Sequence, residues 1–110
     1  MAIDERLADI LRKSLNAVPG IEEKRMFGGI AFLLNRHMVC GVHKGGAMFR
    51  VGKENEAKAK TIHGAKDMEF TGRRMGGMID VDDAALLDAE RRIVWLTMAL
   101  DYVKSLPPKR

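Results

Sequence analysis

The fold of this chain is decided by one stretch, residues 30–51, which reads IAFLLNRHMVCGVHKGGAMFRV. It contains three runs rich in apolar residues: 30–34, 37–42 and 47–51. Two turn segments, Asn35-Arg36 and Lys44-Gly45-Gly46, separate these runs. Short apolar runs bounded by turn residues are typical of β-strands, and a two-residue connection joins antiparallel strands in a hairpin. The stretch therefore predicts a meander of three antiparallel strands.

Further strands are predicted on both sides of this meander. Upstream, residues 23–26 form a short strand, and Phe27-Gly28-Gly29 forms a bulge or tight bend because glycine permits close backbone approach. Downstream, residues 68–71 and 78–81 form a strand pair across a loop at residues 72–77. We therefore expect a sheet of about five to six strands.

Helices are predicted at both ends of the chain. Residues 4–18 place apolar side chains at helical spacing: Leu7, Ile10, Leu11, Leu15 and Val18. Pro19-Gly20 ends this helix, and residues 53–62 have weaker helical character. Asp82 or Asp83 is a suitable N-cap for one last helix that runs to about Ser105. The predicted fold class is α+β, an antiparallel sheet flanked by an N-terminal and a long C-terminal helix in two layers.

Composition predicts one globular domain over residues 1–110, with residues 107–110 as a frayed tail. Hydrophobic residues make up 46% of the chain and charged residues 31%, the balance of a folded protein. The single cysteine, the lack of a secretory start and the absence of an apolar run near the ~20 residues of a membrane span favour the cytoplasm. The net charge of +4 permits nucleic-acid binding without requiring it, because lysines alternate with glutamates and alanines in residues 53–60.

No catalytic residues, metal site or cofactor are predicted. His37 and His43 are expected to share one strand face, too far apart for a common ion, while Cys40 lies on the other face as a buried thiol. An apolar environment would raise the pKa of that thiol and so oppose a nucleophilic role. The acidic cluster at residues 80–83 is interpreted as helix capping rather than as acid–base chemistry.

Two double-glycine bends with neighbouring basic residues are candidates for anion or nucleic-acid binding. The residues are Lys24, Arg25, Gly28, Gly29, Arg73, Arg74, Gly76 and Gly77. Glycine N–H groups beside arginines can form an anion nest. Neither segment matches a phosphate-loop or dinucleotide motif, and the simpler interpretation is that the glycines bend strands and the arginines keep loops soluble.

The last helix carries two apolar stripes. Its first stripe is expected to pack on the sheet and consists of Leu86, Ile93, Leu96, Leu100 and Val103. Trp95, Met98 and Tyr102 form the second stripe, on another side of the helix. Because tryptophan and tyrosine are enriched at binding hot spots, this stripe is a candidate interface for a protein partner or for self-association, with deeper burial as the alternative.

The order of these motifs resembles the amino-terminal domain of the TfoX/Sxy family. The resemblance is carried by residues 24–32 (KRMFGGIAF), 49–52 (FRVG) and 68–73 (MEFTGR), followed by a closing helix that ends near Tyr102. It implies an α+β domain and a role in the regulation of natural competence. Full-length members act as transcriptional co-activators alongside the cyclic-AMP receptor protein. They also carry a carboxy-terminal domain, so this chain is expected to act as a stand-alone amino-terminal domain.

These observations lead to three alternative hypotheses for the function. The first is a non-enzymatic regulatory binding module that contacts a protein partner in transcription regulation. A second is direct nucleic-acid binding through the basic double-glycine bends. The third is a small binder of a phosphorylated metabolite, or an enzyme acting on one.

Overall fold

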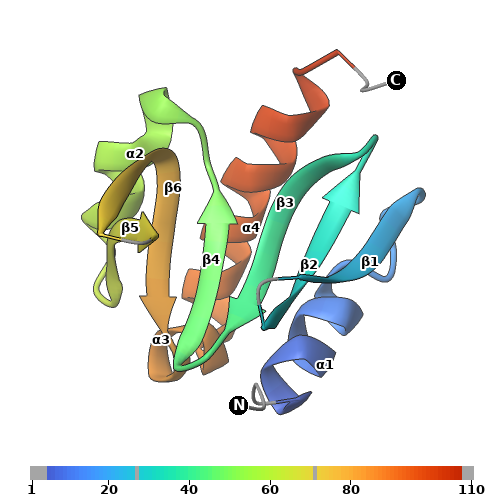
Figure 1. The fold of residues 1–110 in the computed structure, drawn as a ribbon, viewed down its shortest axis with the longest axis horizontal. Helices are drawn as coiled ribbons and strands as arrows, with labels where there is room; N and C mark the ends of the chain where they lie inside the picture. The colour runs from blue at the N-terminus through green and yellow to red at the C-terminus, as the bar shows by residue number, and fades with distance from the viewer. Residues whose placement is uncertain (1–4, 27, 71, 108–110) are drawn as a thin grey trace.

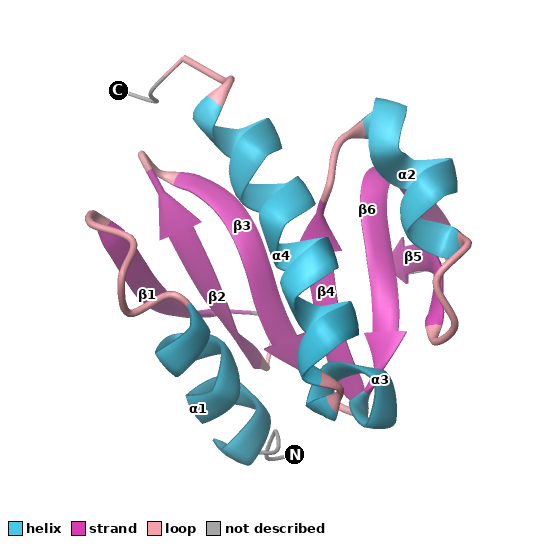
Figure 2. Ribbon diagram, turned by 180° about the vertical axis from the view of Figure 1, so that it is seen from behind, coloured by secondary structure: helices cyan, strands magenta, loops and turns pink. Residues whose placement is uncertain are grey.

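The computed structural model describes residues 5–26, 28–70 and 72–107, which form an open sheet with helices on one face (Figure 1). The sheet has six strands in the order β1-β2-β3-β4-β6-β5, and every neighbouring pair is antiparallel. Seen from behind, the helices lie in front of the sheet (Figure 2), and no described helix covers its other face (Figure 1). The expected α+β class and two-layer arrangement are confirmed.

The strands follow the predicted meander closely. Their bounds are β1 Ile21–Met26, β2 Gly29–Leu34, β3 His37–His43, β4 Gly46–Arg50, β5 Ala65–Phe70 and β6 Arg73–Asp82. Asn35 and Arg36 connect β2 to β3, and both have positive φ angles, 54° and 67°. Such a left-handed pair is the tight hairpin turn whose twist matches the flanking strands. The predicted two-residue connection is therefore confirmed.

The β5–β6 hairpin is tighter than predicted. Residues 72–77 were expected to form a loop, but β6 begins at Arg73 and already includes Gly76 and Gly77. The pairing with β5 shifts register between Asp67 and Glu69, and Gly77 has a φ of 83°. An irregular register and a positive-φ glycine let a strand bend without ending it. β6 is accordingly bent in Figure 1.

The first two helices are α1 Glu5–Ser14 and α2 Lys53–Lys60. The first was expected to continue to Val18 but ends four residues earlier. Beyond it the chain tightens through hydrogen bonds from Asn16 N to Lys13 O and from Val18 N to Leu15 O. Bonds of this i to i+3 type close the last turn of a helix before the chain leaves it.

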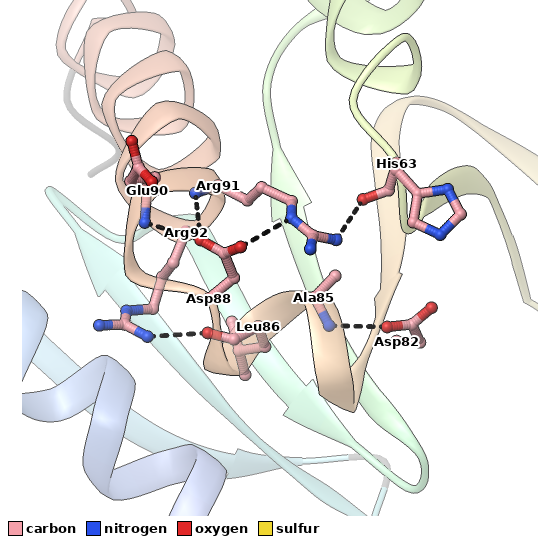
Figure 3. Close-up of polar contacts among 8 residues, drawn as sticks. All are labelled: His63, Asp82, Ala85, Leu86, Asp88, Glu90, Arg91 and Arg92. Carbon is pink, nitrogen blue, oxygen red and sulfur yellow. Dashed lines mark hydrogen bonds and ion pairs between the residues drawn. The ribbon is translucent and has the colours of Figure 1, made fainter.

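The expected single last helix is in fact two, α3 Asp83–Leu87 and α4 Ala89–Lys104 (Figure 3). Asp88 separates them in an extended conformation, and its carboxylate accepts hydrogen bonds from Glu90 N and Arg91 N. Asp82 caps α3 in the same way through Ala85 N. The predicted capping role of Asp82 is confirmed, whereas the continuous helix is wrong because Asp88 begins a new one.

The core lies between the sheet and the helices. In β2, Ile30, Phe32 and Leu34 belong to it, so alternation places Ala31 and Leu33 on the helix-free face. The buried residues of α4 are Trp95, Leu96, Ala99 and Val103. Ile93, assigned to the sheet-facing stripe, is 58% exposed. That assignment is wrong because the buried face of α4 is centred between the two predicted stripes.

Candidate functional site

The two double-glycine bends do not form one site. Gly28 and Gly29 belong to the β1–β2 hairpin at one edge of the sheet, whereas Gly76 and Gly77 lie in β6, next to the opposite edge. Two strands, β3 and β4, therefore lie between the two bends along the sheet. Any anion bound by both would have to span this distance.

The β1 bend also divides its basic residues. Alternation along β1 places Lys24 on the helix-free face and Arg25 on the helix face, where Arg25 lies 3.5 Å from the Glu5 carboxylate. Gly28 has a φ of 75° and no atom within 4 Å of the position that a Cβ would take. Gly28 therefore allows the hairpin to turn, because glycine adopts a positive φ angle without strain.

The β6 bend binds an internal carboxylate. Gly77 N donates a 2.9 Å hydrogen bond to Oε1 of Glu56, which is 5% exposed, and Gly77 O accepts from Val51 N and Gly52 N. The N–H expected to serve an external anion is thus occupied by the protein's own α2 residue. The side chains of Arg73 and Arg74 lie outside the described part of the structure.

Beside this bend is a hollow of about 610 Å³ between the end of β4, the start of α2 and the end of α4. Arg50 and Lys53 supply its positive charge, and neither makes an ion pair within the described residues. The Arg50 guanidinium lies 5.6 Å from the centre of the Tyr102 ring, in a cation–π contact. Glu54 and Asp101 also line the hollow, so its charge is mixed.

Trp95 is not part of an exposed stripe. Its side chain is fully buried, its Nε1–H donates to Ala59 O at 3.1 Å, and its ring lies 6.0 Å from that of Phe49. Trp95 therefore connects α4 to α2 by a hydrogen bond and to β4 by a ring contact. Of the two alternatives for the stripe, deeper burial is therefore correct for Trp95, whereas Met98 and Tyr102 are partly exposed.

The histidines of β3 have separate roles. His43 Nε2 lies 2.7 Å from Asp80 Oδ1, and this hydrogen bond is the main reason that the pKa of His43 is raised. His37 is nearly buried and its Nε2 lies 2.6 Å from Pro107 O. The two were expected to share a face, which is wrong. The pairing of β2 with β3 leaves Val39 without a partner, which is a β-bulge. His37 therefore lies with Leu34 on the helix side of the sheet, opposite to His43.

Cys40 is the buried thiol that was predicted. It has no exposed surface, and burial raises the pKa of its thiol. Within residues 5–26, 28–70 and 72–107 no three side chains of metal-binding type come together. No helix of that part is long and apolar enough to cross a membrane.

The helix-free face of the sheet carries a group of apolar side chains, here called the methionine face. Its members by strand alternation and register are Ala31, Leu33, Met38, Met48 and Met78. Met48 is paired with Gly41, and its Cε methyl would lie 2.9 Å from a Cβ at that glycine. Ala31 is fully buried and Met78 is 6% exposed, while the other three are partly exposed. The sequence signal for this face is the unbroken apolar run of residues 30–34, because a strand places successive side chains on opposite faces and this one is apolar on both.

The family model described as the TfoX N-terminal domain matches residues 13–103. No curated protein and no solved structure matches the chain.

Proposed function

The chain belongs to the TfoX N-terminal domain family, and we propose that it is a non-enzymatic regulatory binding module that acts by contact with a protein partner in transcription regulation. The observation that supports the proposal is the methionine face, of which Leu33, Met38 and Met48 are partly exposed. A sheet normally buries its apolar side chains under helices, and apolar surface without such a cover is typical of interaction sites. Methionine is flexible and polarizable, so it adapts to a partner's surface.

Charge at the margins of the methionine face favours a protein partner of mixed charge. Asp80 and His43 are hydrogen-bonded at one end of it, and Lys66 is in register with Asp80 on β5. An apolar centre with charged margins is the usual anatomy of a protein–protein interface.

The test is a calorimetric titration of the chain with the cyclic-AMP receptor protein in the presence of cyclic AMP, the partner implied by the family. Met48→Glu should weaken binding at least about tenfold, because it would bury an unpaired charge in the contact. Thr97→Glu, on the exposed side of α4, is the matched control and should bind as the wild type does. Binding that Met48→Glu leaves unchanged would exclude the methionine face, and no binding by the wild type would exclude this partner.

Nucleic-acid binding is the second candidate, and the observation that favours it is the hollow lined by Arg50 and Lys53, which make no ion pair with a described residue. Fluorescence anisotropy with mixed-sequence duplex DNA at about 50 and 200 mM salt tests it, since each neutralised phosphate releases counterions. The double variant Arg50→Ala/Lys53→Ala should lower the salt dependence by nearly two counterions. Lys13→Ala on α1 is the control. Binding that is absent, or insensitive to salt, would contradict this candidate.

A further inference from the structure

β1 is a free and regular strand edge. It is the first strand in the sheet order, and β2 is its only neighbour among the described strands. All six residues, Ile21–Met26, pair in one uninterrupted register. The opposite edge strand, β5, has a register shift between Asp67 and Glu69. Irregularities of that kind protect an edge from pairing with another chain, and the described β1–β2 pairing has none.

The charges on β1 follow a self-complementary order. Glu22 and Lys24 lie on the helix-free face, both exposed, and neither makes an ion pair with a described residue. Glu23 lies on the helix face and is held by Arg12 through two hydrogen bonds of 2.7 Å. This contact lowers the pKa of Glu23. The strand therefore presents an unpaired acid and an unpaired base, two residues apart on one face.

We propose that two copies of this chain pair through β1, antiparallel, about a two-fold axis that passes Glu23. Directly opposed residues of antiparallel strands lie on the same face, so the axis must pass beside one residue and its copy. An axis at Glu23 places Glu22 of each copy opposite Lys24 of the other, which forms two cross-strand ion pairs. The two sheets then continue into each other, with all helices on one face.

The charges also select this register. An axis at Lys24 would set two lysines directly opposite each other, which is unfavourable. An axis at Glu23 opposes two glutamates, but each is already bound by Arg12, so their charges are neutralised. A register shift of two residues thus separates a favourable arrangement from an unfavourable one. This inference does not depend on the proposed contact through the methionine face.

The opposing interpretation is that the charges keep the edge solvated, since charged side chains commonly prevent edge pairing. Sedimentation equilibrium at low salt separates the two. The wild type should form a dimer, and Glu22→Lys and Lys24→Glu should each raise its dissociation constant at least about tenfold, because each opposes like charges. Lys66→Glu, at the other edge, is the control and should dimerise as the wild type does.

The decisive measurement is a mixture of the two variants. Glu22→Lys carries two basic residues and Lys24→Glu two acidic ones, so together they should form a heterodimer that neither forms alone. The doubly exchanged variant, Glu22→Lys/Lys24→Glu, should dimerise again. A wild type that stays monomeric, or variants whose mixture behaves as two separate monomers, would overturn the proposal. Circular dichroism confirms that each variant is folded, as expected for exposed side chains.

Discussion

Gly52 is the residue at which replacement should be most informative, because two separate effects meet there. Its φ of 88° and ψ of 152° lie in a region that essentially only glycine occupies. A Cβ at this position would also lie 2.6 Å from Cδ1 and 2.9 Å from Cε1 of the Tyr102 ring. We therefore predict that Gly52→Ala destabilises the fold through backbone strain and through overlap with Tyr102.

The magnitude follows from the two effects. Backbone strain of this kind costs about 1–3 kcal/mol, and overpacking a close contact costs about another 1–3 kcal/mol. The free energy of unfolding should thus fall by about 2–6 kcal/mol. Gly45 is the matched control, because its φ is 100° but no atom lies within 4 Å of its Cβ position. Gly45→Ala should therefore lower the free energy of unfolding through backbone strain alone, by about 1–3 kcal/mol.

The assay is equilibrium urea unfolding of Gly52→Ala, Gly45→Ala, Tyr102→Ala and the double variant Gly52→Ala/Tyr102→Ala. If the overlap is real, Gly52→Ala should cost less in the Tyr102→Ala background than in the wild type, by about 1–3 kcal/mol. A cost for Gly52→Ala that equals that of Gly45→Ala, and that Tyr102→Ala leaves unchanged, would refute the reasoning.

Three further predictions concern single groups. Asp80→Asn should return the raised pKa of His43 toward its ordinary value in an NMR titration. It should also lower the free energy of unfolding more below about pH 6.5 than at alkaline pH, because the contact with Asp80 stabilises the fold only while His43 is protonated. Cys40 should react with a thiol reagent slowly in the folded protein and rapidly in urea, because its thiol is buried and its pKa raised; equal rates would contradict this. Asp88→Ala should lower the thermal unfolding midpoint more than Asp83→Ala does, because Asp88 caps the long helix α4; equal midpoints would show that the cap is dispensable.

The sequence predicted the sheet well because its turns depend on local chemistry. Asn35-Arg36 is a two-residue connection, and both residues adopt the conformation that such a turn requires. The break at Asp88 could have been predicted from the same chemistry, since aspartate is a preferred N-cap. It was missed because the apolar residues on both sides continue at helical spacing. The bulge at Val39 leaves no local signature, and it moved His37 to the other face of the sheet.

The candidate site was predicted less well because exposure is a property of the whole fold. Trp95 is a typical hot-spot residue by type, yet α2 and β4 close over it. Helical spacing shows which side chains share a face of α4 but not which face meets the sheet. By contrast, Leu33 is apolar and partly exposed, because it lies on the face of the sheet that no described helix covers.

The two double-glycine bends look alike in sequence, but the structure assigns them different physical tasks. Gly28 turns the β1–β2 hairpin in open space, whereas Gly77 bends β6 around a carboxylate that α2 supplies. Replacement of Glu56 by alanine would leave the buried Gly77 N–H without this acceptor, and such a group costs about 1–3 kcal/mol. The β6 bend is therefore part of the structural framework. Binding surfaces are better sought on the methionine face and along β1, where Glu22 and Lys24 make no ion pair with a described residue.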